Sequence, residues 1–264
     1  MAGIVMFGKN SNTGPSPGLW GLAPRDVMYD KATAYGMSWP IGLPVMATTA
    51  AVISGGSGWI GFGDTGAAAV SGQQDDELGG AYAIASDADN EGASISGGVA
   101  PFVLTKAAQD FFFEARVKVS ATTTLDIGFF VGLMDTTACT NAIPITQAGA
   151  LADVNAVGFQ YIEADTVTFD TIYKADGVTA VQVKDAAGAI AAATYLKLGM
   201  LVQKGVLTFF LNGVPLADTK TLPDATGTDF PADVNLRPVV AMLHGTGQAG
   251  DMTTSWLHAY QLRA

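Results

Sequence analysis

The chain has 264 residues, 13 of them basic and 24 acidic, so its formal net charge is −11. With 49% hydrophobic and 14% charged residues it can bury a substantial core, which excludes the weakly hydrophobic, highly charged class of disordered chains. The basic residues are scattered singly and cannot form a stripe that neutralises phosphates, so no nucleic-acid partner is expected.

Residues 1–63 are predicted to form an extended, loop-rich arm. This segment carries Trp20, Trp39 and Trp59 but few alternating runs. An arm cannot bury such large rings by itself, so we expect its own domain or a neighbouring subunit to cover them. Pro and Gly interrupt the uncharged stretch 32–63, and the short apolar start lacks the form of a secretory signal. No membrane contact or targeting segment is expected.

The next region is glycine-rich and acidic. Asp87, Asp89 and Glu91 occupy alternate positions before Gly92, an arrangement that resembles the opening of a calcium loop. The twelfth position of that pattern is Gly98, which has no side-chain oxygen to close the site. These three acids remain a calcium candidate, but we favour a turn-rich acidic loop and expect no cofactor.

The many glycines and prolines, together with Ala, Thr and Val, give a turn-rich chain in which long amphipathic helices are hard to place, and from about residue 102 the pattern becomes that of β-strands. Apolar residues alternate with Glu114, Arg116 and Lys118, which predicts a strand with one buried and one solvated face. The run 127–133 is almost wholly apolar and predicts a central strand covered on both faces. Further strands are expected at 157–161, 167–173, 195–203, 206–211, 237–243 and 253–262.

Turn residues punctuate these strands. Asn212-Gly213 is a strong hairpin signal, and Pro215 beyond it indicates a sheet edge or a strand end. The alanine-rich stretch 185–194 contains Gly188 and is open between a short helix and a loop. Strands at this spacing predict an all-β sandwich.

Glycoside cleavage needs a pair of carboxylates at one sugar bond. Glu163 and Asp165 match the start of the Glu-x-Asp-x-x-Glu run of sandwich glucanases, but the last position is Thr168. We therefore expect no enzyme. Trp59, Tyr82 and Asp87 have the aromatic rings and the carboxylate that an exposed sugar-binding platform needs, although no spacing singles these residues out.

His244 and His258 could meet only if their strands pair, and no carboxylate pattern accompanies them. Both are expected to be ordinary strand residues. Cys139 is the single cysteine, so it cannot form an intramolecular disulfide and is expected to be a small buried residue.

The runs 111–119 and 126–133 resemble core strands of concanavalin-like jelly-roll sandwiches. The 212–213 hairpin and the closing runs 237–242 and 255–263 extend this resemblance over roughly residues 100–264. The expected division is an arm at 1–63 and a β-sandwich domain at 64–264.

The same ordering is similar to sandwich proteins among the structural proteins of tailed-bacteriophage virions. This resemblance implies a non-enzymatic capsid decoration or cement subunit on the capsid exterior. Its partners would be the major capsid protein and copies of itself, in an oligomer such as a trimer, with Trp20, Trp39 and Trp59 at the contacts. The alternative is a carbohydrate-binding, lectin-like module on a virion or secreted.

Overall fold

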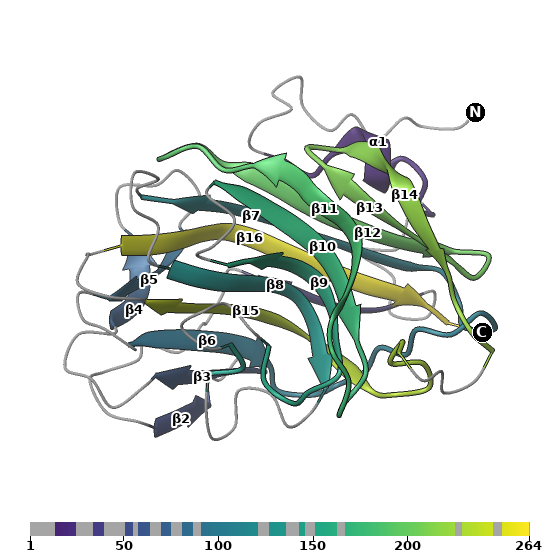
Figure 1. Ribbon diagram of the computed structural model, residues 1–264, viewed down its shortest axis with the longest axis horizontal. Helices are drawn as coiled ribbons and strands as arrows, with labels where there is room; N and C mark the ends of the chain where they lie inside the picture. Colours follow the sequence, from purple (N-terminus) through teal and green to yellow (C-terminus); the bar gives the residue numbers. More distant parts are fainter. Residues whose placement is uncertain are drawn as a thin grey trace.

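A computed structural model describes residues 14–24, 34–39, 51–54, 58–63, 70–74, 81–86, 91–120, 127–135, 143–145, 151–162, 167–224, 229–244 and 250–263. These residues form a sandwich of two antiparallel eight-stranded sheets (Figure 1). The predicted all-β jelly-roll sandwich is confirmed. No helix of the described residues has the length and apolar character needed to cross a membrane.

The first sheet, called sheet A, has the strand order β14-β13-β12-β7-β16-β5-β4, and β1 also pairs with β16. The strand β16 is long enough to pair with β5 through its first half and with β1 through its second half. The strands of sheet A are β1 (Ala34–Trp39), β4 (Val70–Gln74), β5 (Ala81–Ser86), β7 (Phe111–Val119), β12 (Leu196–Gln203), β13 (Val206–Leu211), β14 (Val214–Thr221) and β16 (Gly250–Leu262).

The second sheet, sheet B, has the order β11-β10-β9-β8-β15-β6-β3-β2. Its strands are β2 (Ala51–Ser54), β3 (Trp59–Gly63), β6 (Gly92–Gly97), β8 (Ile127–Asp135), β9 (Ala156–Tyr161), β10 (Thr168–Lys174), β11 (Val181–Ala189) and β15 (Leu236–His244).

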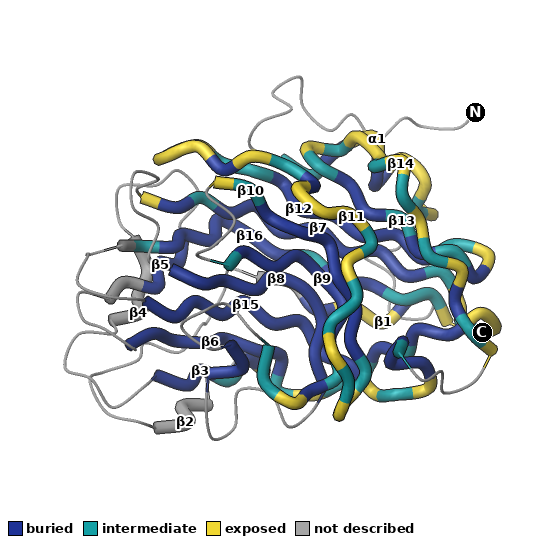
Figure 2. Tube along the Cα trace, in the orientation of Figure 1, coloured by how far each residue is buried: buried dark blue, intermediate teal, exposed yellow. Residues whose placement is uncertain are grey.

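The main core lies between the two sheets and is rich in aromatic rings. Phe159 makes edge contacts with Phe169 and Phe209, whose ring centroids lie 6.0 and 5.3 Å away. Every residue of β8 and β15 is buried, which confirms the expectation of a central strand at 127–133 (Figure 2). Removal of this apolar surface from water is the main stabilising contribution.

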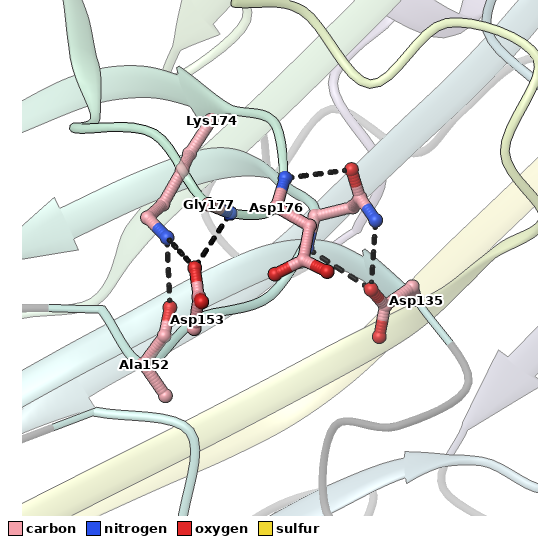
Figure 3. A network of polar contacts seen from close by, with 7 residues as sticks. Asp135, Ala152, Asp153, Lys174, Asp176 and Gly177 are labelled. Atoms are coloured by element: carbon pink, nitrogen blue, oxygen red, sulfur yellow. Dashed lines mark hydrogen bonds and ion pairs between the residues drawn. The ribbon is translucent and has the colours of Figure 1, made fainter.

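Sheet B is closed on its outer face as well. A second apolar cluster joins Phe130 and Met134 of β8 to Ile143, Ile145 and Val154, which lie between β8 and β9 in the chain. Hydrogen bonds and an ion pair join residues 152–155 to Asp135 and to residues 174–177 (Figure 3). The Asn155 amide donates to Asp135 Oδ2, and the Asp176 N–H donates to Asn155 Oδ1.

Residues 34–63 contribute three strands that pair within the sheets, whereas the sequence suggested an extended arm over 1–63. The strand β1 pairs with β16, and β2 and β3 lie at one edge of sheet B. The only helix of the described residues is α1 (Pro17–Trp20), which contacts β14. Segments before residue 64 are therefore integral to both layers of the sandwich.

The hairpin at Asn212-Gly213 is present, with φ of 52° and 79° at these two residues. The strand after it, β14, is an edge strand of sheet A, as Pro215 indicated. The sequence left a short helix and a loop open for residues 185–194. The structure instead places residues up to Ala189 in strand β11. A bulge there is held by the Ala186 N–H, which donates to Asp170 Oδ1 at 2.9 Å.

Candidate functional site

The outer face of sheet A brings chemically varied side chains into three rows across β12, β7 and β16. These rows follow from the strand register, because directly opposed residues of antiparallel strands lie on the same face. The rows are Lys197–Arg116–Trp256, Gly199–Glu114–His258 and Leu201–Phe112–Tyr260.

Glu114 stands at the centre of this face and is fully buried. Its Oε2 accepts the Ser16 N–H at 2.9 Å and the Trp20 Nε1–H at 2.7 Å. Among the described residues no group hydrogen-bonds its other oxygen, Oε1. Burial raises the pKa of the Glu114 carboxyl, although hydrogen bonding from Ser16 and Trp20 and the charge of the Lys197 ammonium act in the opposite direction.

His258 is the direct cross-strand partner of Glu114. Burial lowers the pKa of its imidazole to about 4, so the ring is neutral at pH 7. Within the described part of the chain its Nδ1 also has no hydrogen-bond partner. The middle row therefore holds an acceptor oxygen and a ring nitrogen whose hydrogen-bonding capacity is unused.

Aromatic rings surround this pair. Trp256 stacks on the His258 ring with 5.1 Å between ring centroids, and Trp20 meets His258 edge-on at 6.0 Å. Trp20 also packs against Phe112 and Tyr260 at 6.1 and 5.9 Å. Polar atoms bordered by indole and phenol rings are the usual components of a sugar-binding site, because sugars combine apolar ring faces with hydroxyl groups.

The outer face of β7 corrects one expectation from the sequence. Glu114, Arg116 and Lys118 were predicted to be solvated, but Glu114 is inaccessible and Arg116 is only 9% exposed. The segment carrying α1 covers Glu114, and the Arg116 guanidinium lies 3.4 Å above the centre of the Tyr195 ring. Alternation identified the correct face but not the segments that cover it.

The tryptophans expected at subunit contacts are covered by their own chain where the structure describes them. Trp20 packs on sheet A, and Trp59 lies in the core between the sheets; they are 3% and 2% exposed. Trp39 belongs to β1, and its side chain lies outside the described residues. Trp59 and Tyr82 are both core residues, so the sugar platform considered for them is wrong.

The acidic calcium candidate is described only at Glu91, which is buried; Asp87 and Asp89 lie outside the described residues. Within the described ranges no group of three or more His, Cys, Asp or Glu side chains is placed to hold a metal ion. Cys139 also lies outside them.

The two histidines do not meet, because His244 is on β15 of sheet B and His258 is on β16 of sheet A. The glucanase-like positions fall between two strands. β9 ends at Tyr161 and β10 begins at Thr168, and Glu163 and Asp165 lie outside the described residues.

Sequence reasoning missed the Glu114–His258 pair. The two residues are far apart in the chain and become neighbours only through the pairing of β7 with β16. The available signal was the alternation within each strand, which groups Glu114 with Arg116 and Lys118 and groups His258 with Trp256 and Tyr260. This signal required the strand order to become useful.

Comparison with solved structures places the chain among jelly-roll sandwiches. One match comes from work on endo-acting O-glycanases with which members of the human gut microbiota initiate mucin breakdown; it has 9% identity, a TM-score of 0.50, and covers 91% of this chain and 97% of that one. The carbohydrate recognition domain of Emp47p matches with 12% identity, a TM-score of 0.49, and coverage of 89% and 99%.

An endo-1,3-beta-glucanase from Streptomyces sioyaensis has 10% identity and a TM-score of 0.48, over 70% of this chain and 76% of that one. At such identities the similarity concerns the fold. No protein-family model and no curated protein matches the chain.

Proposed function

We propose that this protein binds carbohydrate and does not cleave it. Support comes chiefly from the Glu114–His258 pair, which offers unused hydrogen-bonding atoms between the rings of Trp20, Trp256 and Tyr260. A buried polar atom without a partner costs free energy, and a ligand hydroxyl that supplies the missing hydrogen bonds would recover it. The O-glycanase match provides further support, since that fold accommodates glycans in another protein.

Access to the pair involves the segment that carries α1. The unused atoms are shielded from solvent, and Trp20 lies over them through its hydrogen bond to Glu114 Oε2. A sugar would reach the middle row when this segment shifts, and the Trp20 indole would then change its surroundings. Binding should therefore alter tryptophan fluorescence.

The chemistry of the three rows favours binding over hydrolysis. Glycosidases use two carboxyl groups on either side of the scissile bond, about 5–10 Å apart. Glu114 is the only carboxyl group in the three rows; its neighbours are aromatic rings, His258 and the cations Arg116 and Lys197.

A glycan array followed by titration calorimetry tests this proposal. The protein should bind a restricted set of glycans, and Trp256→Ala and His258→Phe should each weaken binding about tenfold or more, the effect of losing roughly 1.4 kcal/mol. Thr219→Ala on the exposed edge strand β14 is the matched control and should bind as the unaltered protein does. Absence of glycan binding, or equal binding by all variants, would overturn the proposal.

A separate experiment tests the proposal that the protein does not cleave carbohydrate. Incubation with β-glucans and mucin glycans should release no reducing ends. Release that disappears in Glu163→Gln would show that the protein is a hydrolase.

The virion role expected from the sequence is a second candidate, and one surface feature favours an interface. Leu22 is 51% exposed and Val214 is 65% exposed. They belong to the two segments that meet where Gly18 of α1 packs on the Gly213 carbonyl. Light scattering would show a closed oligomer such as a trimer that Val214→Asp disrupts, whereas a monomer that does not bind capsids would contradict this role.

A further inference from the structure

The α1 segment, residues 14–24, forms its backbone hydrogen bonds within itself. The N–H groups of residues 19–23 all donate to carbonyl oxygens that lie between Ser16 and Trp20. Among the residues that the structure describes, the segment shares no backbone-to-backbone hydrogen bond with either sheet. Movement of the segment away from sheet A would therefore leave every described strand pairing intact.

The hydrogen bonds from the α1 segment to sheet A end on a single atom. The Ser16 N–H and the Trp20 Nε1–H both donate to Glu114 Oε2. A carboxylate oxygen has two lone pairs, and these two donors use both of them. A sugar hydroxyl can therefore take this oxygen only when the segment moves away, so the segment and a sugar compete for one acceptor.

Apolar contacts keep the segment closed over the site. Leu19 and Trp20 are buried in one cluster with Phe112 and Phe210 of the sheet. Because opening would expose these side chains to water, the closed form is the more populated one without a ligand. The helix itself adds little stability, since it has four residues and the Ser16 hydroxyl forms no cap hydrogen bond.

We propose that the α1 segment is autoinhibitory: it competes with the glycan for Glu114, so that only molecules with the segment displaced bind. This inference rests on the proposed carbohydrate binding and specifies its regulation. When only the open form binds, the apparent dissociation constant is the intrinsic one divided by the open fraction. A change that unseats the segment without altering the site should therefore strengthen glycan binding.

Gly18 of α1 provides such a change. A Cβ atom added to Gly18 would overlap the carbonyl oxygen of Gly213, in the turn between β13 and β14, and the paired strands on both sides hold this turn. Gly18→Ala should therefore push the segment off the sheet while every side chain of the site stays unchanged. Gly14→Ala is the matched control in the same segment, because a Cβ at Gly14 meets no atom within 4 Å.

Hydrogen exchange measures opening without any glycan. The amides of residues 19–23 should exchange about tenfold faster in Gly18→Ala than in the unaltered protein and in Gly14→Ala. Exchange of the β7 amides should be the same in all three proteins, which would show that the sandwich remains folded.

A glycan array run with the same three proteins measures binding, and the array glycan bound best is then titrated by calorimetry. Gly18→Ala should bind about tenfold more tightly than the unaltered protein, and Gly14→Ala should bind as the unaltered protein does. Trp20→Phe removes one donor to Glu114 but keeps an aromatic ring. It should also bind more tightly, and it serves as the test if Gly18→Ala does not fold.

The outcomes separate autoinhibition from carbohydrate binding. Faster exchange in Gly18→Ala with unchanged or weaker glycan binding would overturn autoinhibition and leave carbohydrate binding intact. Equal exchange and equal binding in Gly18→Ala and Gly14→Ala would overturn it as well, because the segment would then not be displaced. Binding by Gly18→Ala alone would support both proposals, whereas no binding by any variant would count against both.

Discussion

The ring of Tyr260 occupies the space in which a side chain at Gly36 would stand. A Cβ atom added to Gly36 would lie 1.9 Å from Tyr260 Cδ1 and 2.0 Å from Cε1. The two residues are direct partners in the pairing of β1 with β16. The absence of a side chain at Gly36 thus allows the ring to lie flat on β1 and to reach Trp20.

Gly36→Ala should destabilise the protein by about 1–3 kcal/mol, because the new methyl group must displace an aromatic ring from a packed position. Urea denaturation monitored by circular dichroism would measure the change. Gly63→Ala is the control, since a Cβ at that strand glycine meets no atom within 4 Å. Equal stability of both variants would show that Tyr260 moves aside at little cost.

Glu114 should contribute to stability through the donors it accepts. Glu114→Ala leaves the Ser16 N–H and Trp20 Nε1–H buried without an acceptor, at a cost of about 1–3 kcal/mol for each. Glu114→Gln keeps an acceptor oxygen and should cost much less. Denaturant titration compares the two, and tryptophan emission should shift to longer wavelength only in Glu114→Ala. Similar losses in both variants would assign the effect to charge.

His258 should make stability depend on pH. Its pKa is about 4 in the folded protein and 6.5 when unperturbed, so the unfolded chain binds more protons between these values. Stability should therefore fall as pH decreases from about 6.5 to 4, with about 3 kcal/mol at most attributable to this residue. In His258→Phe the decrease over this window should be smaller by that contribution. An unchanged pH profile would mean that His258 titrates normally.

Asn155 should be important for the segment that closes sheet B. Its side chain donates to Asp135 Oδ2 at 2.9 Å and accepts the Asp176 N–H at 3.0 Å. Asn155→Ala should cost about 1–3 kcal/mol, since Asp176 and Asp135 lose these partners. Thermal unfolding would measure it. Lys184→Ala, which breaks an exposed ion pair with Asp218, should change stability by less than about 1 kcal/mol; a larger effect there would contradict this ranking.

The alternation of residues by itself determined much of the sandwich. Period-two patterns at 113–119 and 253–262 and the apolar run at 127–133 each became a strand, because side chains of a strand point to opposite faces. Asn212-Gly213 fixed a hairpin because both residues tolerate positive φ. These are local properties, so they can be read without knowing the strand order.

Which residues meet depends on the pairing of strands that are distant in the chain. Pairing of β7 with both β12 and β16 places Glu114 beside His258 and Arg116 beside Lys197 and Trp256, and local patterns do not specify such partners. Packing of α1 on sheet A then buried the Glu114 side chain that alternation assigned to solvent. The candidate site depends on long-range register and on coverage by a distant segment, and neither is encoded in the period of a single strand.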